Sequence, residues 1–159
     1  TRVHLLMPGE QTAEAMRIAL LARIPELQVT SQSLENFDAA RERQLMGEAD
    51  YYLVGVSEPA ISAVALGGAE DLPNLPDHSP ASVQKALLSE ATAVTRVVAM
   101  LNSPYRAPEF APLADAVLAT YDGAPIGFGG APGPAFQALA KVLCGQIECQ
   151  GRLPVSLPG

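Results

Sequence analysis

The sequence predicts an α/β domain: a mostly parallel sheet of five or six strands with helices on both faces, in a three-layer sandwich. Apolar runs with the character of strands alternate along the chain with segments that repeat apolar residues at helical spacing. The spacers between successive strands are long enough for the crossovers that parallel strands require. Hydrophobic residues make up 48% of the chain and aromatic residues only 5%, which suits an interior of Ala, Leu and Val. With 159 residues, we predict a single domain that spans residues 1–159.

The chain opens with a predicted strand and helix. Residues 3–7 form a short apolar run that Pro8 and Gly9 end. Residues 12–24 then repeat apolar side chains with helical periodicity, up to Pro25.

A second strand and helix follow, and then a third strand. Residues 27–30 alternate as a strand does, and residues 34–46 have the pattern of an exposed amphipathic helix whose charged face includes Glu42. Residues 51–56 are continuously apolar, which predicts a strand buried on both faces.

The middle of the chain contains its least regular stretch. Residues 57–79 are rich in Gly, Pro and acidic residues and predict a loop, with one short helix near residues 61–65. Ser79 and Pro80 have the residue types of a helix cap and first turn, so a helix is expected from there to Ala91.

The last third of the chain predicts two more strands and a helix. The strands are residues 96–101 and 115–121, with a turn at 102–105 and a short helical piece near 108–113 between them. Residues 122–133 form a Gly-rich loop, and residues 134–143 form the last clear helix. The remaining segment, residues 145–159, is punctuated by Pro154 and Pro158, so we expect it to run extended and to cover an apolar seam.

Charge and composition argue against several classes of partner. The net charge of −7 and the pI of about 4.7 disfavour nucleic acid, because such binding depends on Lys and Arg. No uninterrupted apolar run reaches the roughly 18 residues of a membrane span, so no membrane partner is expected. No leader-like segment is visible, which favours a cytoplasmic location, although the abrupt start at Thr1 also fits a piece of a longer protein.

The Cys and His residues do not predict a metal site or a cofactor. Cys144 and Cys149 are expected to be free, buried thiols, because a domain of this size needs no disulfide. Together with the distant His4 and His78 they do not form a four-ligand set with recognisable spacing. We therefore expect neither metal nor cofactor.

The sequence comes close to two functional motifs, a dinucleotide-binding loop and a hydrolase elbow, but it completes neither. The glycines of residues 127–133 precede a helix, yet the chain ends before a following strand could supply the acid of a dinucleotide site. Ser57 follows a strand as in a hydrolase elbow, but Pro59 stands where a second Gly is needed and His78 lies unusually near in sequence. A serine hydrolase is thus kept as a weaker alternative.

The end of the chain resembles the carboxyl-terminal α/β sandwich domain of glycoside hydrolase family 3. That family has a helix ending in Leu-x-Gly, then Ile-Asn-Pro-Ser-Gly-Arg or Lys-Leu-Pro-Val, and a further Pro. The matching residues here are Gly145, Ile147, Gly151, Arg152, Leu153, Pro154 and Pro158. Glu148, Cys149 and Gln150 replace the Asn-Pro-Ser part.

Two further stretches are similar to the same family. Residues 97–105 resemble its strand followed by an Asn-Pro-Tyr or Ser-Pro-Tyr turn, and residues 116–121 resemble its next strand. The resemblance covers nearly the whole chain. Its structural motif here consists of Gly145, Gly151, Arg152, Leu153 and Pro154.

The resemblance implies that the chemistry of the family lies outside this chain. Family members join an amino-terminal catalytic barrel to this domain, and the nucleophilic Asp belongs to the barrel. In the glucosidase branch an acid/base Glu comes from a Glu-Gly-x-Asp-Arg loop of this domain, but Glu70-Asp71 lacks the Gly and the Arg, so that role is not transferred. Ser103-Pro104-Tyr105 is more similar to the N-acetylglucosaminidase branch, where a His of the barrel replaces the Glu.

The resemblance therefore implies the non-catalytic carboxyl-terminal domain of a β-N-acetylhexosaminidase-like hydrolase of carbohydrate metabolism, inactive when isolated. Its partner would be the catalytic barrel of the same polypeptide, and it would meet a carbohydrate substrate only indirectly, along one wall of the sugar site. The loop residues expected to face the barrel or the sugar are Glu58, Glu70, Asp71, Asn102, Tyr105 and Arg106. The alternative is a free-standing α/β domain that binds a small molecule or regulates another protein.

Overall fold

The computed structural model describes residues 1–57, 79–151 and 156 as a three-layer α/β sandwich. Its strands are β1 (Arg2–Met7), β2 (Gln28–Ser33), β3 (Tyr51–Val56), β4 (Thr95–Met100) and β5 (Ala116–Ala119). Its α-helices are α1 (Glu10–Leu21), α2 (Ala39–Gly47), α3 (Pro80–Glu90), α4 (Ala107–Phe110) and α5 (Pro134–Leu143). Short 3₁₀ turns are η1 (Leu34–Asn36), η4 (Ala111–Leu113) and η5 (Phe128–Gly130).

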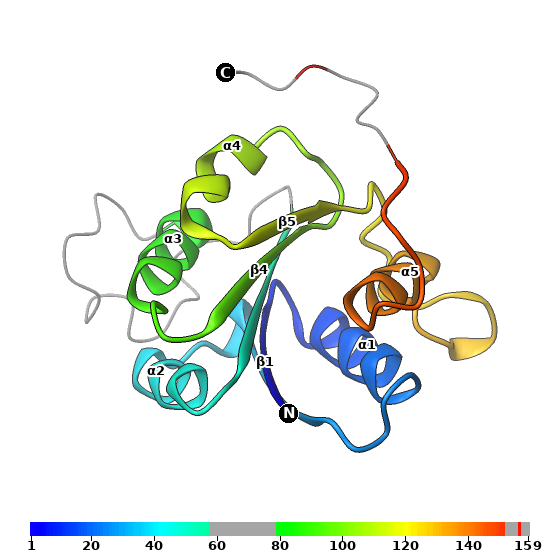
Figure 1. Cartoon of the computed structure of the whole chain (residues 1–159), viewed down its shortest axis with the longest axis horizontal. Helices are drawn as coiled ribbons and strands as arrows, with labels where there is room; N and C mark the ends of the chain where they lie inside the picture. The colour runs from blue at the N-terminus through cyan, green and yellow to red at the C-terminus, as the bar shows by residue number, and fades with distance from the viewer. Residues whose placement is uncertain (58–78, 152–155, 157–159) are drawn as a thin grey trace.

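All five described strands run parallel in the order β2-β1-β3-β4-β5. Helices α1 and α5 cover one face of the sheet, and α2, α3 and α4 cover the other (Figure 1). The predicted fold class is confirmed.

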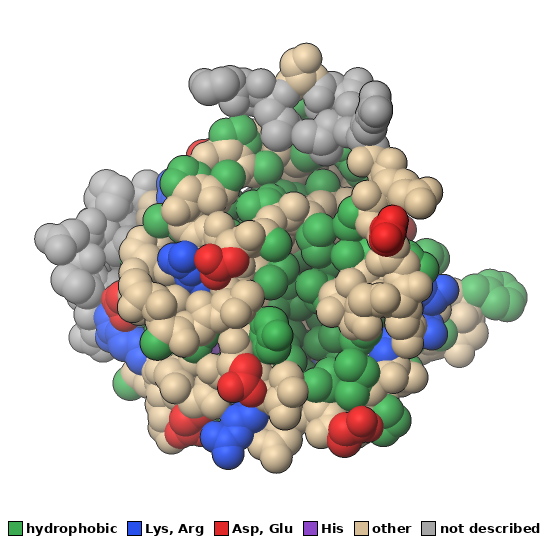
Figure 2. Space-filling model, viewed as in Figure 1, with side chains coloured by type: hydrophobic (Ala, Val, Ile, Leu, Met, Phe, Trp, Pro, Cys, Tyr) green, Lys and Arg blue, Asp and Glu red, His purple; other side chains and the backbone are tan. Residues whose placement is uncertain are grey.

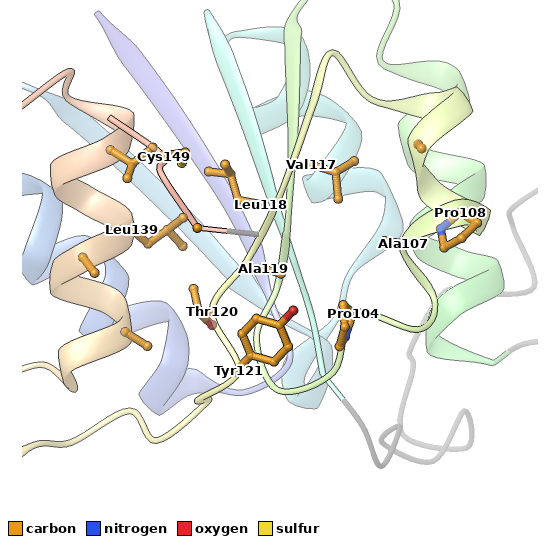
Figure 3. Close-up of a pocket in the computed structure, with 15 residues that line it drawn as sticks. Pro104, Ala107, Pro108, Val117, Leu118, Ala119, Thr120, Tyr121, Leu139 and Cys149 are labelled. Carbon is orange, nitrogen blue, oxygen red and sulfur yellow. The ribbon is translucent and has the colours of Figure 1, made fainter. Parts of the chain in front are cut away.

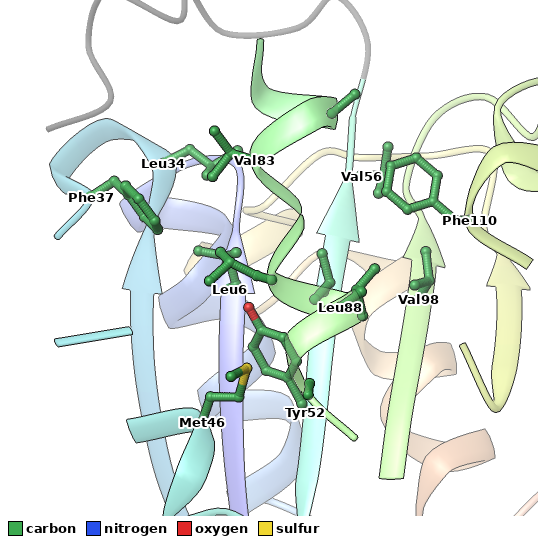
Figure 4. Packing of buried hydrophobic residues seen from close by; sticks show 14 of the residues in the cluster. Leu6, Leu34, Phe37, Met46, Tyr52, Val56, Val83, Leu88, Val98 and Phe110 are labelled. Carbon is green, nitrogen blue, oxygen red and sulfur yellow. The ribbon is translucent and has the colours of Figure 1, made fainter. Parts of the chain in front are cut away.

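Side chains from each central strand supply both hydrophobic cores, because successive residues of a strand point to opposite faces. Leu6 and Val54 enter the cluster under α2, α3 and α4, which also contains Tyr52 and Phe110 (Figure 4). Their neighbours in the chain, including Leu53, enter the cluster under α1 and α5. This two-sided burial explains why residues 51–56 lack a polar alternation.

The predicted helix over residues 34–46 is wrong in its first part. The segment starts with the 3₁₀ turn η1, after which Phe37 and Asp38 are extended, and the helix begins only at Ala39. The Asp38 carboxylate accepts a hydrogen bond from the Arg41 N–H at 2.8 Å, so it caps α2. Short polar side chains that bond to nearby backbone compete with helix formation, which explains the break.

Other elements differ from prediction only in their ends. Helix α1 begins at Glu10 rather than at residue 12, because the Thr12 hydroxyl accepts the Gly9 N–H at 3.0 Å and belongs to the first turn. Strand β2 continues to Ser33, and β5 stops at Ala119. The predicted short helix near residues 61–65 lies outside the described residues.

A buried polar cluster lies between β1, β2, β3 and α2. We define it by Glu42, His4, Tyr52 and Gln32, all of which are buried. The Tyr52 hydroxyl donates to Glu42 Oε1 at 2.8 Å, and Gln32 Nε2 donates to Glu42 Oε2 at 2.7 Å. The sequence pattern placed Glu42 on an exposed face, and that expectation is wrong.

His4 completes this cluster from the middle of the sheet. Its ring stacks on Tyr52 with centroids 5.8 Å apart, and its Nδ1 lies 2.8 Å from the Thr30 hydroxyl. Its Nε2 lies 3.0 Å from Glu42 Oε2, within ion-pair distance but not aligned as a hydrogen bond. Burial, and next the charge of Glu42, raise the pKa of Tyr52 well above its usual value. These groups hold α2 against the sheet rather than forming an exposed site.

Candidate functional site

The carboxyl ends of the five strands define the edge of the sheet where α/β domains of this type bind ligands. Strand order reverses between β1 and β3, and in open parallel sheets the crevice outside such a point is the usual site. Among the described residues, this edge carries the turns after β1, β2, β4 and β5, together with Ser57 at the end of β3.

The amino terminus of α1, where such folds often bind phosphate, is occupied by a side chain of the protein. The Glu35 carboxylate accepts the Glu10 N–H at 3.0 Å. A Cβ added to Gly9 would lie 2.9 Å from Glu35 Oε1, so the carboxylate is packed directly against this turn. An internal anion at the positive end of the helix leaves no place there for a phosphate.

The turn after β4 places Asn102, Tyr105 and Arg106 at this edge. Tyr105 is 54% exposed, and Asn102 is exposed. The Arg106 guanidinium binds Glu109 through two hydrogen bonds of 3.0 Å, and Lys85 Nζ lies 3.2 Å from the same carboxylate. The hydrogen bond from Arg106, and secondarily that from Lys85, lowers the pKa of Glu109. Arg106 therefore connects the turn after β4 to Glu109 in α4.

The remaining predicted positions fall at the end of the chain or outside the described residues. Glu58, Glu70, Asp71, His78, Arg152, Leu153, Pro154 and Pro158 lie outside the described residues. Gly145 has φ +69°, and its N–H and that of Gln146 donate to the Val142 and Lys141 carbonyls at 3.0 and 2.8 Å. This is a Schellman cap of α5, which explains the Gly at this position.

A hollow of about 720 Å³ lies over β5 between α4 and α5, and we call it the β5 groove. Its floor is Val117, Leu118 and Ala119, with Thr120 and Tyr121 at the end of the strand. Figure 2 shows apolar side chains gathered over this part of the molecule, and Figure 3 shows the labelled lining residues.

Small apolar side chains form the walls of the β5 groove. Ala107 and Ala111 stand on the side of α4 and η4, and Ala138 and Leu139 on α5. Among the described residues that line it, none has a charged side chain, although the chain carries a net charge of −7. An open apolar hollow of this kind favours an apolar occupant.

Tyr121 marks the end of the β5 groove nearest the carboxyl edge. It has φ +60°, a left-handed conformation that is uncommon for residues other than Gly, and its side chain is 45% exposed. The preceding Thr120 anchors this bend, because its hydroxyl donates to the Leu101 carbonyl at 2.8 Å. The bend directs the Tyr121 ring toward Pro104 across the groove (Figure 3).

The chemical groups in the described part of the chain do not assemble into a metal site. Residues 1–57, 79–151 and 156 contain no group of three or more His, Cys, Asp or Glu side chains suited to hold a metal. Cys144 and Cys149 are free; Cys144 is half-buried, and Cys149 is exposed, contrary to the expectation of two buried thiols. Burial raises the pKa of the Cys144 thiol.

Among residues 1–57, 79–151 and 156, no helix is long and apolar enough to cross a bilayer.

Sequence reasoning did not find the β5 groove. A signal was present in the small residues that recur on two segments flanking β5, at Ala107 and Ala111 and at Ala135 and Ala138. The small side chains of these residues project little from the two helical segments, so space remains between the segments. Only the fold reveals that the two segments face one another across an edge strand.

The fold and these sites define an open, parallel α/β sandwich domain with an apolar groove at one sheet edge. No family model matches the chain. The chain is 33% identical, over 98% of its length, to a segment of Beta-hexosaminidase A from Pseudoalteromonas piscicida, and it spans 28% of that protein.

A solved structure shares the fold. It is a fungal multi-domain GH3 β-N-acetylglucosaminidase that, by its title, has a GCN5-related glucosamine N-acetyltransferase region. It matches 99% of this chain and 16% of its own length, with 24% sequence identity and a TM-score of 0.63. The chain is thus related in sequence to a segment of a β-hexosaminidase and has the fold of part of a GH3 enzyme.

Proposed function

We propose that this chain is the non-catalytic carboxyl-terminal domain of a β-N-acetylhexosaminidase-like glycoside hydrolase of family 3. The observation that carries the proposal is the 33% identity to Beta-hexosaminidase A along nearly the entire chain, which nevertheless accounts for only 28% of that enzyme. A segment of that size leaves room in the relative for a catalytic barrel of roughly 250 residues. The catalytic steps would then belong to the barrel, and this domain would pack against it.

The carboxyl edge of the sheet is the part that we propose to line the sugar site. Tyr105 and Asn102 are exposed there, and an aromatic ring with a polar tip suits a surface that is partly covered and partly wet. Arg106 is held at this turn by two hydrogen bonds to Glu109. The described residues that line the β5 groove include no carboxylate, whereas glycoside hydrolysis uses a pair of them.

Activity measurements on the 159-residue chain test the catalytic assignment. The chain should not hydrolyse aryl β-N-acetylglucosaminides or aryl β-glucosides, whereas the longer protein that contains it should hydrolyse the former. Robust turnover by the chain itself would contradict the proposal. The reading frame upstream of Thr1 gives an independent test, because 300 or so residues of repeated βα units are expected there.

The β5 groove favours a second candidate, a free-standing domain that binds a small molecule. Its volume of about 720 Å³ lies in the range of ligand pockets, which is about 300–1,000 Å³. However, such sites carry a few converging polar groups, and the lining here is almost entirely apolar. An initiator Met just upstream of Thr1 would favour this candidate over the domain of a larger enzyme.

A further inference from the structure

A loop between β5 and α5 presents a fully exposed aromatic ring. The ring belongs to Phe128, the first residue of the 3₁₀ turn η5. Residues 124–133, which we call the Phe128 loop, project beyond α1 and α5 (Figure 1). The sequence around the ring is Gly-Phe-Gly-Gly, so the residues on either side carry no side chain that would keep a partner from enclosing it.

Backbone hydrogen bonds brace the Phe128 loop. The Gly127 N–H donates to the Ala131 carbonyl at 2.7 Å, just below the ring. The Gly133 N–H donates to the Pro125 carbonyl at 2.9 Å, at the base of the loop. A loop that is already ordered loses little conformational entropy on binding, so its exposed ring is suited to anchor the domain in a pocket of a partner.

An apolar hollow of about 320 Å³ lies beside the Phe128 loop. Ile18 on α1 and Ile126 in the loop line it, and both side chains are exposed. Phe128 follows Ile126 by two residues, so the three apolar side chains belong to one side of the molecule. A surface of this kind favours contact with another protein surface. The exposed carboxylates of Glu10 and Glu14 border the same hollow.

The charges at this surface disfavour a second copy of the chain as the partner. Two copies that met through the Phe128 loop would bring their carboxylates together, and each copy has a net charge of −7. Arg17 pairs with Glu14, so the border keeps the charge of Glu10. The similarity to Beta-hexosaminidase A suggests another partner, because 28% of that protein matches this chain and most of it lies outside the match.

We propose that the Phe128 loop anchors this domain to the rest of the longer polypeptide. The Phe128 ring enters an apolar pocket of the catalytic barrel, and a Lys or Arg at the border of that pocket lies opposite Glu10. The loop follows the carboxyl end of β5, so an anchor there also fixes the carboxyl edge of the sheet, with Tyr105, relative to the barrel. This inference rests on the proposed function and adds the contact that holds the two parts together.

Photo-cross-linking in the longer protein tests the anchor. Phe128→p-benzoylphenylalanine places a photoreactive ring at the tip of the loop, and mass spectrometry identifies the residues that it attaches to. We expect cross-links to residues of the same polypeptide outside the 159-residue segment. Tyr51, an exposed aromatic residue at the start of β3, is the matched control position and should lack them. Cross-links between two copies, or no more product from position 128 than from position 51, would overturn the proposal.

Removal of the ring in two contexts gives a second test. In the 159-residue chain, Phe128→Ala should leave the urea midpoint unchanged, because the ring is fully exposed. In the longer protein, the same substitution should lower the midpoint at which this domain unfolds, because an enclosed ring is lost. An unchanged midpoint in both proteins would contradict the anchor.

Hydrolysis of aryl β-N-acetylglucosaminides by the longer protein separates the two proposals. Hydrolysis without cross-links from position 128 would overturn the anchor and leave the proposed function intact. Absence of hydrolysis would count against the proposed function itself.

Discussion

The buried polar cluster around Glu42 makes the fold sensitive to a single carboxylate. Replacing Glu42 by Ala removes the acceptor of the Tyr52 hydroxyl and one acceptor of Gln32, together with the carboxyl oxygen 3.0 Å from His4 Nε2. All three partners are buried, so water cannot replace the lost carboxylate without opening the core. We expect Glu42→Ala to be strongly destabilising.

The contacts set the size of this effect. Gln32 Nε2 keeps a second acceptor, the Asp38 carbonyl at 3.1 Å, and His4 Nε2 makes no hydrogen bond to Glu42, so the Tyr52 hydroxyl is the group that loses its partner. A buried polar group left without a partner costs about 1–3 kcal/mol. For a domain of this size, the melting temperature should fall by roughly 2–12 °C.

Urea denaturation followed by circular dichroism measures this loss, with Glu48→Ala as the matched control. Glu48 lies at the end of the same helix and is exposed, so its removal should change stability by about 0.5 kcal/mol or less. Glu42→Gln, which keeps the shape and one acceptor, should lose less than Glu42→Ala. If Glu42→Ala and Glu48→Ala had the same small effect, the cluster would not be assembled as described and the reasoning would fail.

Three other predictions concern single positions. The pKa of Tyr52 is raised in the folded state, so the free energy of unfolding should not depend on this group below about pH 10. Above that pH it should fall by up to about 1.4 kcal/mol per pH unit. Alkaline titration of Tyr52→Phe should lack this slope. A Cβ at Gly133 would lie 1.9 Å from a backbone oxygen, so Gly133→Ala should lower the urea midpoint. A Cβ at Gly47 meets nothing within 4 Å, so Gly47→Ala should raise stability by about 0.5–1 kcal/mol. The reverse order of the two effects would refute this packing. Exposed Cys149 should react with a thiol reagent before Cys144, whose pKa burial raises, and faster labelling of Cys144 would contradict the described burial.

The sequence by itself determined the elements whose signals are local. The continuous apolar run at β3, the Ser79-Pro80 start of α3 and the Gly after α5 each depend on a few neighbouring residues. Hydrophobic periodicity and capping chemistry act over one or two turns, so they can be read without knowing what the element packs against. The fold class followed, because alternating strands and helices with crossover-sized spacers leave few other arrangements.

Only the tertiary structure decided the placement of residues that are distant in sequence. Glu42 has the surroundings of a surface residue in its own helix, and it is buried because His4, Gln32 and Tyr52 come from three different strands to meet it. The β5 groove likewise exists because small residues from two separate helical segments face each other across an edge strand. The physical reason is the same for both. A periodic pattern shows which face of an element is apolar. Whether a carboxyl group is buried, or a hollow stays open, depends on the side chains that long-range packing brings against that element.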